Sequence, residues 1–320
     1  MSRREYLKIK AVTVRHMTLM RIAILSRKAT LYSTSRLIEA CRQRQADVTV
    51  LDPLQCVVKV SKKRPEVFHN GERVTGIDGI VPRIGASITF YGLAVLRQFE
   101  MMGVFPANES QAISRSRDKL RSLQLLSRYD IGIPPTAFAR RREDVRSAIR
   151  KVGGAPVILK LLEGTQGMGV ILAESVKSAE SVLDAMSSLR QNILIQAFVE
   201  EAHGTDYRAI VVGGKVVAAM ARQAGEGEFR SNLHRGGTAR GLQLEEAYEK
   251  TAVHAAEVLG LNIAGVDMIP SQEGPMVLEV NSSPGLEGIE GATGVDVAGA
   301  MIDFVLARAP LGHPHTRGRG

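Results

Sequence analysis

Apolar and polar positions follow two patterns in the first third of the chain. Short apolar runs predict buried strands, and apolar residues at helical spacing predict helices between them. The strands are expected at residues 21–26, 48–51 and 79–85, and the helices at 33–45 and 89–102. A hairpin turning near Asn70-Gly71 is expected within 57–74. Strands alternating with helices favour an α/β fold, with a parallel sheet covered on both faces.

The remainder of the chain mixes hairpins with helices. Helices are predicted at 116–129, 143–152, 178–189 and 244–259, and strands within 156–173, 193–199, 206–212 and 215–222. We divide the chain into a domain at 20–114 and a second at 115–306, the latter made of lobes at about 115–190 and 191–306. Residues 1–19 are expected to be an extension, with Met17 or Met20 as alternative starts, and residues 307–320 a disordered tail.

A predicted hairpin near the C-terminal end carries the most specific pattern. Its strands are expected at 263–269 and 276–281, joined by a three-residue loop of Gln272, Glu273 and Gly274. That register places Asp267 opposite Glu279, and alternation puts Asn281 on the face of Glu279. Two opposed carboxylates repel unless a cation lies between them, and this oxygen-only set suits Mg²⁺ or Mn²⁺. Two ordinary strand acids on a solvated face are the alternative.

Charge distribution around this hairpin favours the metal site. The chain has a formal charge of +9, yet between Lys250 and Arg308 it holds eight acids and no Lys or Arg. We therefore expect these acids to be neutralised by something other than cations nearby in the sequence. The basic remainder favours acidic partners, although a basic, solvated surface would explain the charge equally well.

Two lysines are candidate phosphate ligands. Lys160 interrupts an apolar strand, and an unpaired buried ammonium is costly, so it requires an anion. The Gly-rich turn that follows comprises Gly164, Thr165, Gln166 and Gly167. Its backbone N–H groups could bind phosphate oxygens. The sequence of this turn does not match a Walker A loop. Lys119 lies in the first turn of a predicted helix, where cations oppose the macrodipole unless an anion binds or Asp118 offsets them.

Other candidates lie at strand ends and in a loop. Arg83 follows a strand, where open α/β sheets bind ligands, and could hold a substrate carboxylate or be an ordinary surface residue. Residues 196–199 could read an adenine edge, with Asp206 or Glu201 on the ribose. Residues 225–241 resemble a catalytic lid in composition, with the candidates Arg230, Ser231, Asn232 and Arg235.

Composition narrows the function further. Only two cysteines occur, so a reduced, cytoplasmic location is the default. No apolar run is long enough to cross a membrane, and no secretory signal is evident. Trp is absent and aromatic residues make up 4% of the chain, which argues against a surface for single-stranded nucleic acid. We expect neither a DNA nor a membrane partner.

These motifs, taken in order, resemble the ATP-grasp superfamily of carboxylate–amine ligases, and within it the RimK family. The resemblance covers about residues 20–306. It is carried by Pro82-Arg-Ile-Gly85, Asn108-Glu-Ser110, Arg117-Asp-Lys-Leu-Arg121, Glu163-Gly-Thr-Gln-Gly167, Phe229-Arg-Ser-Asn-Leu-His-Arg-Gly-Gly237 and Asn281-Ser-Ser-Pro-Gly-Leu-Glu-Gly-Ile-Glu290. It implies a Rossmann-like pre-ATP-grasp domain followed by a two-lobed ATP-grasp domain. Met168 and Ala197 are mild local departures.

The resemblance also implies residue roles. Lys119 and Lys160 would bind ATP phosphates together with the Gly-rich turn, and Asp206 would hold the ribose. Ala197 and Phe198, beside Gln196, would line the adenine. Nucleotide contacts from the lid would come from Arg230, Ser231 and Asn232. Two Mg²⁺ ions, replaceable by Mn²⁺, would be held by Asp267, Glu279 and Asn281. Apart from the resemblance, Arg83 and Arg235 are our candidates for binding substrate carboxylates.

The implied reaction is the ATP-dependent addition of L-glutamate to the C-terminus of a small-subunit ribosomal protein through an acyl phosphate. Arg222 and Asn232 are our candidates for stabilising the tetrahedral intermediate. The alternatives are the same chemistry on another acceptor, such as free or poly-glutamate or a small-molecule acid, and a non-catalytic, nucleotide-switched RNA-binding protein. We also expect a homo-oligomer.

Overall fold

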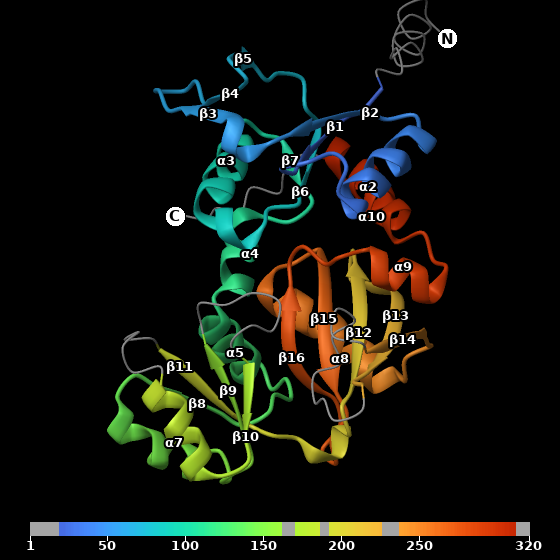
Figure 1. Ribbon diagram of the computed structural model, residues 1–320. Helices are drawn as coiled ribbons and strands as arrows, with labels where there is room; N and C mark the ends of the chain where they lie inside the picture. The colour runs from blue at the N-terminus through green and yellow to red at the C-terminus, as the bar shows by residue number, and fades with distance from the viewer. Residues whose placement is uncertain (1–18, 162–169, 186–191, 226–236, 312–320) are drawn as a thin grey trace, which may run out of the picture.

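The computed structural model describes residues 19–161, 170–185, 192–225 and 237–311. These ranges form a parallel sheet of four strands and antiparallel sheets of four and five strands, with the parallel sheet above the other two in Figure 1. A small three-stranded sheet projects beside the parallel one. No helix in the described ranges is long and apolar enough to cross a lipid bilayer.

The N-terminal parallel sheet has the order β2-β1-β6-β7. Its strands are β1 (Arg21–Leu25), β2 (Asp47–Leu51), β6 (Gly79–Pro82) and β7 (Phe105–Pro106). The associated helices are α2 (Tyr32–Gln43), α3 (Thr89–Met101) and α4 (Ser110–Arg117). The projecting sheet consists of β3 (Cys56–Lys59), β4 (Glu66–His69) and β5 (Glu72–Arg73), with its second turn at Asn70-Gly71 as predicted. The predicted parallel sheet is thereby confirmed.

The central lobe is a four-stranded antiparallel sheet of order β10-β9-β11-β8 with its own apolar core. Its strands are β8 (Thr136–Ala139), β9 (Val157–Leu161), β10 (Val170–Ala173) and β11 (Ile193–Ala197). Helix α5 (Lys119–Arg128) precedes them, and α6 (Val145–Lys151) and α7 (Val176–Ala185) cover the sheet.

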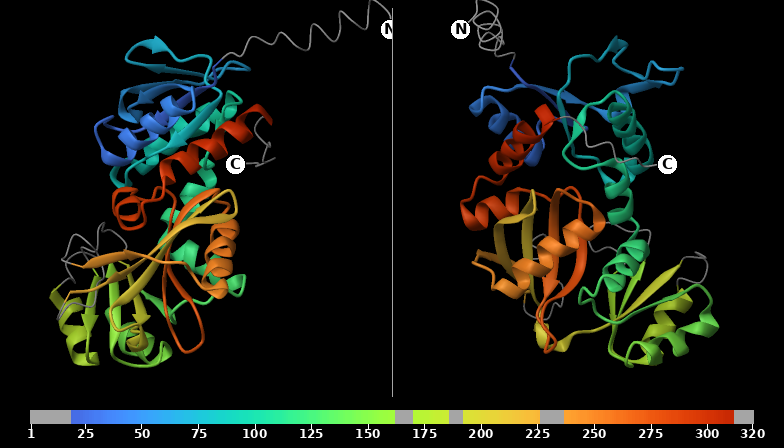
Figure 2. Two further views of the ribbon diagram at one scale, coloured as in Figure 1. Left: turned by 90° about the vertical axis from the view of Figure 1, so that its right-hand side faces the viewer. Right: turned by 180° about the vertical axis from the view of Figure 1, so that it is seen from behind.

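The C-terminal lobe is a five-stranded sheet of order β14-β13-β12-β15-β16, and α8 lies across one face of it (Figure 2). Its strands are β12 (Thr205–Val212), β13 (Lys215–Gln223), β14 (Thr238–Gly241), β15 (Ile263–Ile269) and β16 (Met276–Asn281). The helices are α8 (Glu246–Leu259), α9 (Glu287–Thr293) and α10 (Val297–Arg308).

Two boundaries differ from the sequence-based expectation. Helix α10 continues to Arg308, and a 3-10 turn follows through Leu311. The prediction that a disordered tail begins at residue 307 is therefore wrong for 307–311, where Ala309 is buried against the core. The predicted domain boundary between residues 114 and 115 falls inside α4.

Candidate active site

Five charged side chains form a row across four neighbouring strands of the C-terminal lobe. The strand register sets Asp206 opposite Arg222, Arg208 opposite Asp267, and Asp267 opposite Glu279. In-register partners project from the same face of a sheet, so the row lies on one face of β13, β12, β15 and β16. The opposite face of these strands packs against α8. We call these five residues the charged row.

Bidentate ion pairs hold most of the charged row in place. Arg222 donates through Nε and Nη2 to the two oxygens of Asp206, both at 2.6 Å. Arg208 does the same to Asp267, again with both bonds at 2.6 Å. Arg222 Nη2 also reaches Asp267 Oδ2 at 3.0 Å. Fork-to-fork pairing of this kind fixes side-chain orientation as well as charge.

The electrostatic environment keeps Asp267 ionised. Burial alone would raise the pKa of its carboxyl group, but the guanidinium groups of Arg208 and Arg222 outweigh this effect and lower it to about 2. Burial would likewise lower the pKa of Arg222, whereas the charges of Asp267 and Asp206 raise it. Asp267 is therefore a carboxylate at any physiological pH, as a metal ligand has to be.

The predicted hairpin is confirmed, with one difference at its loop. Asp267 pairs with Glu279 as expected, but the register shifts immediately after Asp267, so that Met268 pairs with Val277. The extra residue is Leu278, which forms a β-bulge. Both strands end at the predicted residues, but the prediction of a three-residue loop is wrong: Ile269 pairs with Met276, and Ser271 and Gly274 exchange backbone hydrogen bonds around the two residues Gln272 and Glu273.

The oxygen donors at this hairpin have unused capacity. An ionised carboxylate offers about four acceptor positions, and described residues occupy three of those of Asp267. Glu279 is exposed and forms no ion pair with any described residue. Asn281 Oδ1 accepts one hydrogen bond, from Ser283 N at 2.9 Å. Two opposed carboxylates beside an amide oxygen therefore fit a hard divalent cation.

A cluster of three or more His, Cys, Asp and Glu side chains suited to a metal does not occur within the described ranges. The hairpin set is of a different kind, because one of its three members is an amide.

Lys160 lies beside this set. It is the fourth of the five residues of β9, paired with Val170 on one side and Leu194 on the other. Burial lowers its pKa to about 8; the charges of Glu279 and Asp267 act against this shift, and the charge of Lys119 adds to it. The charge of Lys160 thus interacts with those of Asp267, Glu279 and Lys119, although these three residues belong to different elements.

Lys119 is the first residue of α5. The helix predicted over 116–129 begins at Lys119 instead, and residues 116 and 117 are the end of α4, which was not predicted. Asp118 between the two helices is extended and caps α5 by accepting a hydrogen bond from Arg121 N at 3.0 Å. The capping carboxylate offsets part of the conflict between the cations and the helix macrodipole. Lys119 and Lys160 remain close enough for their charges to interact.

Comparison with known families accounts for this combination. A family model for the RimK-like ATP-grasp domain matches residues 116–305, and a model for the RimK pre-ATP-grasp domain matches residues 20–113. The chain belongs to the RimK-like ATP-grasp family. This membership confirms the predicted α/β fold class, and it confirms the prediction of an ATP-dependent ligase at the level of the family.

Individual relatives agree with the assignment to the RimK-like ATP-grasp family. The probable alpha-L-glutamate ligase of Vibrio cholerae is 58% identical over 301 residues, which cover 94% of this chain and all of the relative. Its namesake in Thioalkalivibrio sulfidiphilus is 60% identical over the same length. Among solved structures, the ATP-grasp ligase PsnB superposes with a TM-score of 0.72 at 20% identity, covering 91% of this chain and 99% of PsnB. A RimK domain protein from Sphaerobacter thermophilus superposes with a TM-score of 0.66 at 23% identity over 89% and 99% of the two chains.

The predicted adenine hinge of this RimK-like protein is partly occupied by the protein itself. Ala197 N donates to Pro135 O at 2.8 Å, and Phe198 N donates to Pro156 O at 3.3 Å. The buried side chain of Gln196 donates to Thr136 Oγ1 at 2.9 Å. These bonds hold β11 between its neighbours. Two backbone N–H groups of the hinge, those of Ala197 and Phe198, therefore already donate to the protein rather than to a ligand.

Several predicted site residues lie outside the described residues. They are Gly164, Thr165, Gln166 and Gly167 of the turn, and Arg230, Ser231, Asn232 and Arg235 of the loop. Their assignments stay predictions.

Sequence reasoning missed Arg208. The signal for it was the Asp206-x-Arg208 spacing, which puts both side chains on one face of a strand, but only the β12–β15 register brings Arg208 to Asp267.

Four of the C-terminal acids are neutralised by the protein itself. Arginines distant in sequence pair with Asp267, Glu290, Asp296 and Asp303. These partners agree with the expectation that cations nearby in the sequence do not neutralise the acids.

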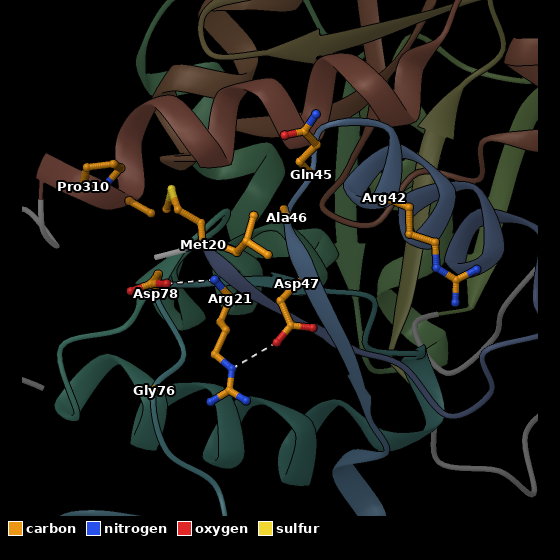
Figure 3. A pocket seen from close by; sticks show the side chains of 11 residues that line it. Met20, Arg21, Arg42, Gln45, Ala46, Asp47, Gly76, Asp78 and Pro310 are labelled. Carbon is orange, nitrogen blue, oxygen red and sulfur yellow. Dashed lines mark hydrogen bonds and ion pairs between the residues drawn. The ribbon is translucent and has the colours of Figure 1, made fainter. Parts of the chain in front are cut away.

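A large hollow lies elsewhere in the molecule. It has a volume of about 1110 Å³ and opens at the amino ends of β1 and β2 (Figure 3), and no residue of the charged row lines it. Three of its charged residues contact one another, since Arg21 pairs with Asp47 at 3.1 Å and the backbone N–H of Arg21 donates to Asp78 at 2.8 Å. We therefore place the candidate site at the hairpin rather than in this hollow.

Proposed function

We propose that this protein joins L-glutamate to the C-terminal carboxylate of a peptide or protein acceptor, using ATP and Mg²⁺, and that its acceptor is the tail of a small-subunit ribosomal protein. The glutamate specificity is supported by the names of relatives that share 58–60% of their residues with this chain. The ribosomal acceptor follows from the RimK resemblance, and the basic chain would suit an acidic tail.

One observation carries the catalytic part of the proposal: Asp267 and Glu279 are directly opposed within the charged row. We assign Asp267, Glu279 and Asn281 to two Mg²⁺ ions, for which Mn²⁺ could substitute. When bound, these ions neutralise phosphate charge and favour in-line transfer of the γ-phosphoryl group. Lys119 and Lys160 would bind the phosphates, and these phosphates would be the anion partner that Lys160 requires.

The reaction would proceed in two steps. A carboxylate oxygen of the acceptor attacks the γ-phosphorus of ATP, ADP leaves, and an acyl phosphate forms. The amine of glutamate then attacks the acyl carbon, loses a proton, and expels phosphate as the C–O bond breaks. Neither step needs a Ser, Cys or His nucleophile.

Arg222 is our candidate for stabilising the tetrahedral intermediate, together with Asn232 of the loop. Its Nε and Nη2 groups are anchored by Asp206 and Asp267, and its Nη1 forms no hydrogen bond to a described residue. A guanidinium group has five donors, so an anchored Arg222 still has donors to offer. Preorganised donors of this type typically contribute about 3–4 kcal/mol to transition-state stabilisation. We also propose that Asp206 contacts the ribose of ATP.

Mass spectrometry tests the reaction directly. The full chain would be incubated with ATP, Mg²⁺, L-glutamate and a Glu-ending peptide from the proposed ribosomal tail, and the products weighed. We expect mass steps of one glutamate residue, coupled to ADP release. Mass steps on free glutamate but not on the peptide would identify another acceptor. Binding of RNA without any formation of ADP would contradict the ligase assignment.

Metal-ligand variants test the site. We expect Asp267→Ala and Glu279→Ala to reduce Mg²⁺-dependent ADP release at least about a hundredfold and to weaken Mn²⁺ binding measured by electron paramagnetic resonance. The matched control is Glu273→Ala, which removes an exposed acid from the loop of the same hairpin. Retained turnover in both site variants would rule out the metal assignment.

A further inference from the structure

The carboxyl ends of β1 and β6 meet at the topological switch point of the N-terminal sheet. From β1 the chain runs outward to β2, whereas from β6 it runs in the opposite direction to β7. Ligands of open α/β sheets bind in the crevice outside such a point. Arg83 is the first residue after β6, and its backbone N–H donates to Leu25 O at the end of β1, at 2.8 Å.

Arg83 has an unsatisfied donor at this point. Its Nη1 atom is buried and has no hydrogen-bond partner among the described residues. Burial and the nearby positive charge of Arg117 lower the pKa of the Arg83 guanidinium to about 10. A buried donor without a partner costs free energy, and a charged one costs more. The folded protein therefore maintains an unfavourable arrangement here in the absence of a ligand.

Arg117 does not relieve this cost. Its guanidinium donates to Gly85 O at 3.0 Å and also to Ile84 O and Thr89 Oγ1, all of them neutral acceptors. These bonds fix Arg117 against the loop that follows Arg83 but leave its charge uncompensated. Neither guanidinium is within ion-pair distance of an acid in the described part of the chain. Two neighbouring positive charges thus share one buried region.

This region borders the proposed catalytic residues. Arg117 precedes Lys119 by two residues, across the break between α4 and α5. On the other side, Pro82 O accepts a hydrogen bond from Ser283 Oγ at 3.4 Å, and the backbone N–H of Ser283 donates to Asn281 Oδ1. The arginine pair therefore lies between the N-terminal switch point and the residues that we assign to phosphate and metal.

We propose that Arg83 and Arg117 form a subsite for the side-chain carboxylate of an acidic substrate. Arg83 would donate to it directly, and Arg117 would add charge and hold the loop. This inference rests on the proposed function, because a ligase that joins glutamate to a Glu-ending chain handles such a carboxylate on both substrates. Its source would be either the incoming amino acid or the last residue of the acceptor.

The test compares stability with ligand binding in the variant Arg83→Gln. Removing an unpaired buried charge should leave the melting temperature of the unliganded protein unchanged or higher. Titration calorimetry in the presence of Mg²⁺ and ADP would then use L-glutamate, and separately a short peptide ending in Glu. We expect one of the two to bind at least tenfold more weakly to the variant, and the affinity for ADP to change by less than twofold.

Matched reagents identify the source of the carboxylate. Arg97→Gln is the control, since Arg97 is an exposed arginine of the same domain. In the wild type, L-glutamine or a Gln-ending peptide should bind as weakly as its acidic counterpart binds to Arg83→Gln. If Arg83→Gln no longer binds the acidic form of one substrate more tightly than its amide form, that substrate is the one whose carboxylate Arg83 recognises.

Two results would overturn the subsite. One is unchanged binding of both acidic substrates to Arg83→Gln, or their failure to bind the wild type. The other is a loss of melting temperature together with ADP affinity, which indicates a structural residue. The proposed function fails separately: acidic ligands that bind through Arg83 without forming an amide would contradict the ligase activity alone, and amide formation with unchanged Michaelis constants in Arg83→Gln would contradict the subsite alone.

Discussion

Lys160 shows how a single residue connects stability with ligand binding. Its ammonium group lies in an apolar strand, and burial lowers its pKa from 10.5 to about 8. The unfolded chain therefore binds more protons than the folded chain between about pH 8 and 10.5, and the stability of the unliganded protein rises with pH across that window. A bound polyphosphate would favour the charged form and reverse the preference.

We expect Lys160→Met to weaken ATP binding at least about tenfold at pH 7, because an ion pair to phosphate is lost. The affinity of the wild type for ATP should fall between pH 7 and 9 as Lys160 loses its proton, whereas that of the variant should stay nearly flat. Titration calorimetry at several pH values checks both statements. Lys215→Met, at an exposed position of β13, is the control. Parallel pH profiles for wild type and variant would exclude Lys160 as a phosphate ligand.

At the scale of elements, the metal hairpin depends on a residue of the N-terminal part of the chain. The buried amide of Asn108 donates to Ile263 O at 2.7 Å and to Ser282 O at 3.1 Å. Its Oδ1 accepts from the backbone N–H groups of Asn262 and Ile263, both at 2.9 Å. All four hydrogen-bonding positions of one side chain thus fix the open end of the hairpin, one residue from Asn281.

We predict that Asn108→Ala destabilises the protein by about 3 kcal/mol, because it leaves several buried backbone groups unpaired. The Mg²⁺ concentration at half-maximal activity should also rise, since the position of Asn281 is no longer fixed. Chemical denaturation and a Mg²⁺ titration of ADP release measure the two effects. Asn262→Ala removes a single bond, to Ala107 O, from the same contact and should cost less. An unchanged Mg²⁺ dependence would show that Asn108 contributes only to stability.

Local patterns predicted the elements better than the contacts between them. The Asp267–Glu279 pairing was predictable because strand alternation is a property of consecutive residues. The break at Asp118 was not, because it depends on the extended backbone of Asp118 and on its capping bond. The contacts of Arg208 and Asn108 were missed for another reason: their partners lie 59 and more than 150 residues away.

On the scale of the whole molecule, the N-terminal domain and the C-terminal lobe share their cores. One apolar cluster joins α3 with α8 and β15, and another joins β1 and α2 with α9 and α10. The central lobe has a separate core. Ion pairs reinforce the shared side: Arg36 of α2 donates to Glu290 at 2.9 Å and to Asp296 at 3.0 Å.

We expect Arg36→Met to lower the free energy of unfolding by about 2 kcal/mol, because the buried Glu290 loses its charged partner. The activity of the folded fraction should be retained, since Arg36 is remote from the charged row in sequence and bonding. Urea denaturation followed by circular dichroism provides the measurement. Arg42→Met, on an exposed position of the same helix, should have no effect. Equal midpoints for the two variants would contradict a stabilising contribution from this ion-pair group.

The hairpin that carries Asp267 and Glu279 is also fixed at its loop. Val277 N donates to Gly132 O at 2.7 Å, and a Cβ atom at Gly132 would lie 2.7 Å from Pro275 O. Adding or removing residues in 270–275 would therefore displace either this contact or the strand register. A fluorescent fusion or affinity tag belongs instead in the exposed stretch 60–64 between β3 and β4, which projects away from the sheets of the central and C-terminal lobes (Figure 1).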